Sequence, residues 1–472
     1  MPVTATSPPA AALSSGRIRF LAAVFAVNLL AFLNVSAMFV AMADIGKALG
    51  TPEALVPLLP TSLYAAVVCV APATPFLLAR LGPRRLLLLA IAGTSATTAL
   101  AFVTPGFWGL VAALFAHGLF CAPIVPATQA VTGQRFAGEA RGVAMAVWGA
   151  GSYASWLVGP LLAGVMVGVF GWRSLFLIPL PFAALSVLLV LWGMERGAIA
   201  RKAADLASLG LAPLVMVLLV ATTSLGPGLG WLDSPTVTAC AIALAIAAPL
   251  YVWRYRKTVA PAFHVGCLAD RNVAFALLII LLFNFFGTGF FQIEFLGKET
   301  HLSAEVFGLR SSIGAATLLL GFAVSGWLTR GARFAACLYG GLAVTLVSKV
   351  GFLLYGTHTD ALEAIWPVAV GGVGFGMVTG VLATLAYRTV AAEHASHVAT
   401  AFILATYLGA SLGAGVLDEV LVAADLVDLA EGMSAAAATL SSFEAEFWVE
   451  LFGTALLLLP AALMLRGKPA TC

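Results

Sequence analysis

The sequence predicts an all-α polytopic membrane protein with about fourteen transmembrane helices, each of which needs about 20 apolar residues to cross a bilayer. The first observation is composition: of 472 residues, 61% are hydrophobic and only 10% are charged. A soluble domain carries about 25% charged residues. The second is that the apolar residues form long runs, and the third is that Lys and Arg gather in alternate loops between those runs.

The candidate spans follow one another along the chain with short polar segments between them. Their ranges are 20–43, 56–79, 84–103, 108–131, 142–169, 174–193, 207–226, 236–253, 273–296, 306–328, 334–355, 363–386, 396–422 and 446–465. The segment before them is rich in Pro, Ala and Ser, which predicts a disordered tail. The apolar run after Arg17 is too long for a cleaved signal peptide, so we expect it to be the first span.

The basic residues predict the orientation. Most of the 24 Lys and Arg residues lie at the N-terminus, in the even-to-odd loops and at the C-terminus, and few lie at the opposite face: Lys47, Arg173, Lys298 and Arg310. Cytoplasmic loops are enriched in Lys and Arg. Both termini are therefore expected in the cytoplasm, with the chain crossing a bacterial inner (plasma) membrane many times.

The spans divide into two groups of six separated by a pair. The expected units are a disordered tail (1–16), an N-terminal six-helix bundle (17–193), a cytoplasmic linker (194–206), an extra central helix pair (207–254), a second cytoplasmic linker (255–272), a C-terminal six-helix bundle (273–467) and a short tail (468–472). Paired six-helix halves are typical of secondary transporters.

Several classes of function are excluded by what the sequence lacks. The net charge of +3 offers no basic patch for nucleic acid, and the six cysteines show no spacing typical of a metal site or a disulfide framework. The chain has no phosphate-binding P-loop and no HExxH or Ser/His/Asp arrangement. We therefore expect no enzyme activity, metal or cofactor. The expected partners are the lipid bilayer and a small molecule, and the expected state is a monomer.

Three stretches carry a family resemblance. They are Gly149–Gly151 with Gly159-Pro160-Leu-Leu-Ala-Gly164 and the exit Gly171-Trp172-Arg173; Asp205–Gly210 with Gly230–Asp233; and Leu81-Gly82-Pro83-Arg84-Arg85. The first resembles the antiporter motif of the major facilitator superfamily. The second resembles the extra helix pair of its fourteen-helix drug:proton antiporter branch, and the third resembles the end of the superfamily's loop motif. The resemblance covers nearly the whole chain and implies the major facilitator fold and secondary transport.

The motif residues also have a physical reading of their own. Glycines at 151, 159 and 164 let a neighbouring helix approach closely, and Pro160 favours a kink because it removes a helix hydrogen bond. A kinked, closely packed helix can pivot, as alternating access requires, although ordinary glycine packing in a bundle is the alternative. The resemblance assigns a conformational role to Gly82, Arg84 and Arg85 in the loop motif.

Departures from the family pattern affect the expected proton site. Pro75 and Ala79 stand where the loop motif has Gly and Asp, and Asn34 stands where the first span usually has Asp. The arginine usual in span 4 is also missing from Leu114–Gly118. The residues through which this branch usually exchanges protons are therefore absent from these positions.

Polar residues within spans are candidates for the transport site, because they are costly in a bilayer. Asn34 and His117 lie at similar depth in spans 1 and 4, so we expect them to meet across the cavity. A histidine in water titrates near neutral pH, so His117 could carry a coupling proton; the alternative is a neutral histidine bonded to a backbone carbonyl. The remaining candidates for the cavity are Tyr153, Asn284, Gln292 and Glu294.

Two further charges lie near the expected outer face. Glu294 and Arg310 flank one short outer loop and form a candidate outer gate, with extension of both side chains to the interface as the alternative. Lys349 lies within span 11, where it either extends outward, the favoured reading, or attracts an anion.

The expected cavity spans are rich in aromatic and small residues, which suit amphipathic compounds better than sugars. The predicted function is therefore export of an amphipathic small molecule or drug by a secondary transporter. One alternative is uptake or facilitated transport of an organic acid without proton antiport. The other is a membrane sensor or structural protein that does not transport.

Overall fold

A computed structural model shows a helical protein, and it describes residues 15–52, 55–56, 58–196, 206–229, 231–258, 266, 270–287, 304–356, 358–391, 394–430 and 432–466. Within these ranges no strand is present. The helices are α1 (Ser15–Ala48), α2 (Leu58–Val70), α3 (Thr74–Leu81), α4 (Pro83–Val103), α5 (Phe107–Cys121), α6 (Ile124–Arg135), α7 (Glu139–Phe170), α8 (Pro179–Gly193), α9 (Leu206–Leu229), α10 (Pro235–Lys257), α11 (Arg271–Phe285), α13 (Ala304–Arg330), α14 (Phe334–Phe352), α15 (Ala361–Leu385), α16 (Ala395–Ala430), α17 (Ala435–Leu456) and α18 (Leu458–Arg466).

The helical membrane fold agrees with the sequence prediction. Within the described ranges, 12 segments are long and apolar enough to cross a membrane, and two shorter apolar helical segments cover Gly210–Thr223 and Arg271–Phe285. These two shorter segments coincide with predicted spans 7 and 9. The all-α membrane class is thus confirmed, whereas the exact count of fourteen stays a prediction.

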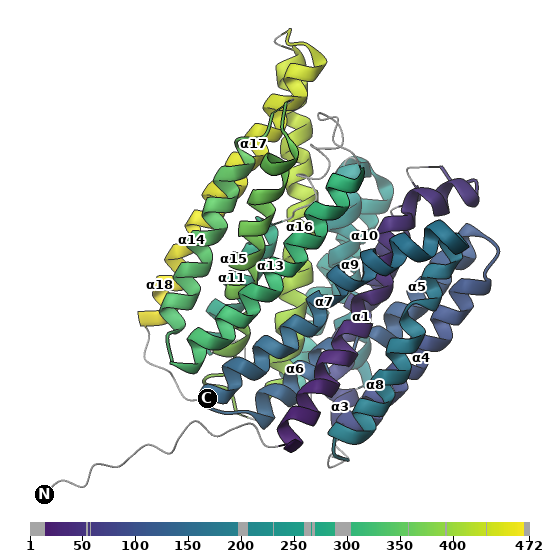
Figure 1. Ribbon diagram of the computed structural model, residues 1–472, viewed down its shortest axis with the longest axis vertical. Helices are drawn as coiled ribbons and strands as arrows, with labels where there is room; N and C mark the ends of the chain where they lie inside the picture. The colour runs from purple at the N-terminus through teal and green to yellow at the C-terminus, as the bar shows by residue number, and fades with distance from the viewer. Residues whose placement is uncertain are drawn as a thin grey trace, which may run out of the picture.

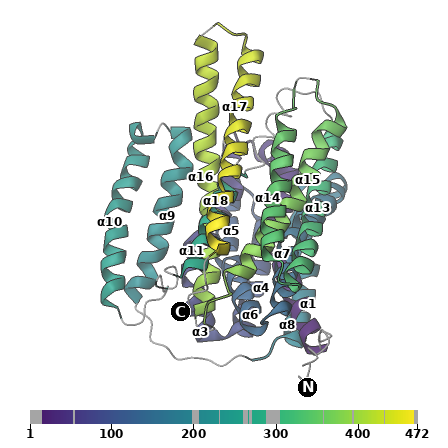
Figure 2. The same ribbon diagram turned by 90° about the vertical axis from the view of Figure 1, so that its left-hand side faces the viewer.

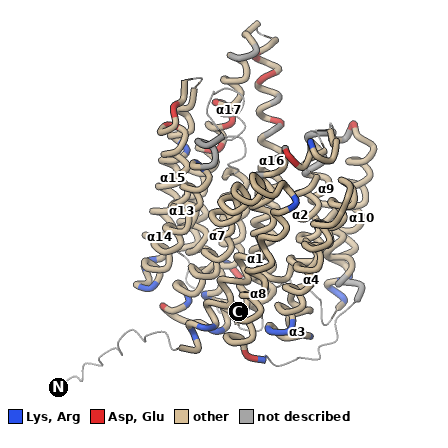
Figure 3. Tube along the Cα trace, turned by 45° about the vertical axis from the view of Figure 1, so that its right-hand side comes forward, with Lys and Arg blue, Asp and Glu red and all other residues tan. Residues whose placement is uncertain are grey.

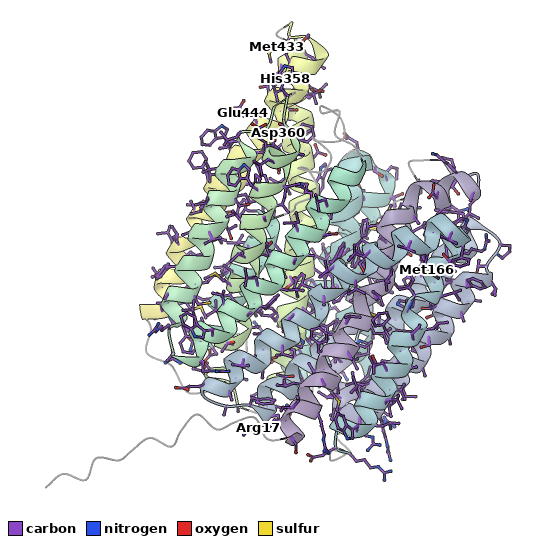
Figure 4. All side chains as sticks on the ribbon, viewed as in Figure 1. Arg17, Met166, His358, Asp360, Met433 and Glu444 are labelled. Carbon is purple, nitrogen blue, oxygen red and sulfur yellow. The ribbon has the colours of Figure 1, made fainter. Side chains whose placement is uncertain are left out.

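The two ends of the bundle differ in charge. Helix α1 begins and α18 ends at the same end of the molecule (Figure 1), and Lys and Arg gather there (Figure 3). We call this the basic end. Arg17 lies at the basic end, whereas His358, Asp360 and Met433 lie at the opposite end (Figure 4). The cytoplasmic orientation of the basic end remains a prediction from its charge.

Helix packing divides the chain into three parts. Helix α1 packs against α7 and α8 in the first half, whereas α13 packs against α15 and α11 against α16 in the second. The halves meet where α7 contacts α13 and where α6 contacts α16. Helices α9 and α10 stand to one side (Figure 2), and α9 contacts α2 and α16. The domain boundaries predicted from the sequence remain predictions.

Glycines make the sharp turns that redirect the helices. Gly82 has φ of 72° and is the single residue between α3 and α4, which then begins at Pro83. Gly171 has φ of 79° and ends α7 before the short 3₁₀ segment Trp172–Leu177. Positive φ is strained for residues with a Cβ. Within α7, the helix continues through Pro160 without interruption.

Candidate functional site

A hydrogen-bond network in the first half joins Asn34 and His117, the two polar residues predicted to meet. Both are almost fully buried. The amide Nδ2 of Asn34 donates to Oγ1 of Thr98 at 3.0 Å, and that hydroxyl lies 3.2 Å from Nδ1 of His117. The two side chains are therefore linked by hydrogen bonds through Thr98 on α4 and do not bond to each other directly. Thr97 on the same helix lies 3.3 Å from the same imidazole nitrogen.

This network retains unused hydrogen-bonding capacity. Oδ1 of Asn34 and Nε2 of His117 have no hydrogen-bond partner among the described residues. A buried polar atom without a partner is costly unless water or a ligand reaches it. The backbone of Thr94 also lies close to the imidazole, so the alternative of a structural histidine stays open. The network can accept a proton or a polar group of a substrate, and its use in transport remains a prediction.

Aromatic rings from both halves meet around Tyr153, another predicted site residue. Its ring centroid on α7 lies 5.5 Å from that of Phe322 on α13 and 5.5 Å from that of Phe375 on α15. Phe375 in turn lies 5.3 Å from Phe283 on α11. Tyr153 therefore belongs to an aromatic contact between the halves, where an aromatic face can stack on a planar substrate.

A small apolar cavity lies between the first half and α16. It is lined by Ala31, Phe32, Leu63, Val67, Cys121, Ala122, Val125, Ile403 and Tyr407. Its volume is about 10 Å³, which is close to the space that one water molecule needs. Tyr407 also contacts Tyr64 of α2, with ring centroids 5.8 Å apart. The lining residues carry no charged group, and two of them, Phe32 and Tyr407, are aromatic.

The predicted glycine contacts differ along α7. A Cβ on Gly151 would lie 2.9 Å from Cα of Phe25, and one on Gly159 would lie 3.0 Å from the backbone nitrogen of Ala37, both on α1. Gly164 differs, because a Cβ there would meet no described atom within 4 Å. The expectation of close packing at Gly164 is therefore wrong: Gly164 lies on the exposed face of α7, whereas its neighbour Ala163 is buried in the core shared with α1.

The predicted residues of the second half are only partly described. Asn284 is buried, and its Nδ2 donates to the Ile280 carbonyl at 2.8 Å within its own helix. Gln292 and Glu294 lie outside the described residues. The candidate gate between Glu294 and Arg310 is consequently not described either.

The alternative in which Arg310 extends to the interface is wrong for this residue. Arg310 is 3% exposed, and its Nε donates to the Ala364 carbonyl at 3.2 Å. The hydroxyl of Tyr355 donates to the same carbonyl at 2.9 Å. Helices α13 and α15 pack closely against each other. The hydrogen bond from Arg310 therefore joins these two helices.

The loop-motif residues lie at the basic end of α4. Arg84 is half-buried and Arg85 is exposed, directly after the Gly82 turn. Their conformational role remains a prediction.

A buried charge cluster is the main feature that sequence reasoning missed. Lys349 of α14 forms an ion pair with Glu450 of α17, and the two side chains are 5% and 0% exposed. The preference for a lysine that extends outward is therefore wrong, because a buried carboxylate holds it inside the bundle. The available signal was the pair Glu446 and Glu450, which lies four residues apart at the start of an apolar span and so on one helix face.

The chain is similar to a known family of membrane proteins. Residues 24–414 match the model of the Major Facilitator Superfamily. The multidrug resistance protein Stp of Mycobacterium tuberculosis is 25% identical over 68% of this chain and 60% of its own length. The multidrug resistance protein B homolog of the same organism is 23% identical over 87% of this chain and 77% of its own. The alignment thus spans less than two thirds of Stp.

A solved structure shares the fold. The proton:xylose symporter XylE, bound to a bromodeoxyglucose, superposes with a TM-score of 0.66 and covers 96% of each chain at 12% identity. At that identity the likeness concerns the arrangement of helices alone.

Proposed function

This chain belongs to the major facilitator superfamily, and from that premise we propose that it exports an amphipathic small molecule or drug across a bacterial inner membrane. It is a multi-pass membrane transporter and not an enzyme. Its relatives include proteins named for multidrug resistance. The proposed branch is that of the fourteen-helix drug:proton antiporters, with both termini in the cytoplasm and a monomer as the working unit.

The apolar, aromatic lining between the halves is the observation that carries this proposal. The cavity lined by Phe32 and Tyr407 and the ring cluster around Tyr153 offer stacking faces and few polar groups. A sugar needs many hydrogen-bonding partners, whereas an amphipathic aromatic compound gains from apolar contact. The cavity is too small for a drug-sized molecule, so the halves must part to admit a substrate.

Contacts at the basic end support alternating access. Nη1 of Arg141 on α7 donates to the Tyr387 carbonyl at 2.6 Å and so joins the two halves. Nearby helices α6 and α16 pack against each other while Gln129 and Thr400 are fully buried. The Gln129 amide and the Thr400 hydroxyl have no hydrogen-bond partner among the described residues. If the basic end opened, water could form hydrogen bonds with these groups. Those hydrogen bonds would offset part of the cost of separating the halves.

Transport by purified protein in proteoliposomes tests the proposal. A panel of amphipathic aromatic cations, neutral compounds and organic acids is loaded outside or inside, and movement is followed with and without a pH gradient. We expect movement of the aromatic compounds, with a substrate-dependent pH change if protons are exchanged. Movement of sugars alone, or of none of the panel, would contradict the proposal.

The second candidate function is uptake of an organic acid, and the structure weakens the argument for it. An unpaired Lys349 could have attracted the anionic group of such a substrate, but Lys349 is paired with Glu450. A sensor that does not transport remains the third candidate, and the same proteoliposome assay separates it from an exporter.

A further inference from the structure

The buried cluster between α14 and α17 contains more negative than positive groups. Lys349 pairs with Glu450. One turn earlier on α17, Glu446 is fully buried and lies within hydrogen-bonding reach of Glu450. The two helices are in contact, in the second half and away from the network of Asn34 and His117. Three ionisable side chains are thus gathered in a part of the bundle that the proposed transport site does not use.

Charge balance in this cluster requires one proton. With every group ionised, two carboxylates would face one ammonium and leave a net charge of −1. Neither oxygen of Glu446 has a hydrogen-bond donor among the described residues. Adjacent carboxylates repel, and a bilayer-embedded bundle penalises an unbalanced charge. A proton held between the two carboxyl groups removes the repulsion and supplies the missing donor.

Among the described residues, Glu450 and Lys349 are the charged groups that act on Glu446. On α16, Oε1 of Glu419 accepts a hydrogen bond of 2.9 Å from Trp231, while Asp425 and Asp428 lie farther toward the tip. Arg271 of α11 donates to the Leu463 carbonyl at the other end of the bundle. Tyr355 and the buried Arg310 of α13 both donate to the Ala364 carbonyl. The described part of α18 before its terminal Arg466 contains no titratable side chain.

We propose that Glu446 and Glu450 form a proton-binding site in the second half, with Lys349 as its fixed counter-charge. The site holds one proton when the cluster is neutral and carries a charge of −1 when the proton leaves. The use of this proton in transport rests on the proposed export function, because only a transporter would convert the change in charge into a change between the two states of the bundle. The binding of the proton does not depend on it.

Infrared spectroscopy of the full-length purified protein in detergent tests the site without any substrate. We expect the C=O band of a protonated, buried carboxyl group at neutral pH, which disappears as the pH is raised. Glu446→Gln should lose this band, because Glu450 and Lys349 then balance each other. The matched control is Glu444→Gln, because Glu444 lies on the exposed face of the same helix (Figure 4) and should leave the band unchanged.

A second variant keeps the test decisive if Glu446→Gln does not fold. Glu450→Gln leaves Glu446 opposite Lys349, so this variant should also lack the band. A wild-type protein without the band at any pH, or a Glu446→Gln protein that retains it, would overturn the site. Because the measurement uses no transported compound, its failure is separate from a failure of the export assay.

Discussion

The two halves of this protein use the same backbone contact but different polar chemistry. In the first half, Gly159 of α7 brings that helix against α1; in the second, Gly413 of α16 brings that helix against the backbone of Phe285 on α11. The buried polar groups differ. The first half holds the uncharged network of Asn34, Thr98 and His117, whereas the second holds the charged cluster of Lys349, Glu446 and Glu450.

This difference shows that close helix packing and the placement of buried charges are separate properties of the fold. Glycine contacts depend on backbone geometry, so both halves can keep them. Buried carboxylates need a counter-charge, and only the second half supplies one within the described residues. Position 34 holds no carboxylate, whereas a buried carboxyl pair is present in the second half.

The largest expected effect comes from removing the counter-charge of the second half. Lys349→Met leaves Glu450 buried without its partner, which typically destabilises a protein by about 3–5 kcal/mol. The loss should be smaller at low pH, because protonation neutralises the carboxyl groups. Thermal unfolding in detergent measures it, with Lys47→Met, at an exposed lysine, as the control. Equal stability of the two variants would mean that the ion pair contributes nothing.

The glycine contact should tolerate no large side chain. Gly159→Leu forces α7 away from α1, at a cost of about 1–3 kcal/mol for overpacking, and we expect transport to be abolished while the protein still inserts. Gly164→Leu is the matched control, since its Cβ meets open space. Transport assays on both variants check the contact, and full activity of Gly159→Leu would argue against it.

Changing His117, in the network of Asn34 and Thr98, should have a smaller effect that concerns transport and not stability. His117→Gln cannot titrate near neutral pH. If His117 carries the coupling proton, this variant should lose the accumulation driven by a pH gradient, about tenfold per proton for a gradient of one unit, and keep downhill exchange. Uphill transport with unchanged pH dependence would show that the coupling proton binds at another site. The cluster of Glu446 and Glu450 would then be the first site to test.

The smallest effect should come from the bridge between Asn34 and His117. Thr98→Val removes the hydroxyl that both side chains contact, which costs about 1 kcal/mol for a hydrogen bond of this kind. Thr98→Ser keeps the hydroxyl and serves as the control. A chemical unfolding curve in detergent compares the two, and identical curves would show that the bridge has no energetic role.

The sequence alone determined the membrane class, the order of most helices and the family. These depend on local information, because a long apolar run requires a helix in a bilayer wherever its neighbours lie. It also predicted that Asn34 and His117 would meet, because family topology and span depth place them together. The contact at Gly159 follows from the same motif, but the motif does not distinguish Gly159 from Gly164.

Only the tertiary structure decided which buried groups become partners. Lys349 and Glu450 are 101 residues apart, and hydropathy cannot tell a lysine that reaches the membrane surface from one held by a carboxylate on another helix. The same holds for Thr98, an ordinary span residue until α4 places its hydroxyl between α1 and α5. The physical reason is that hydrophobicity dictates which segments leave water, whereas the partners of buried polar groups depend on how helices distant in sequence pack together.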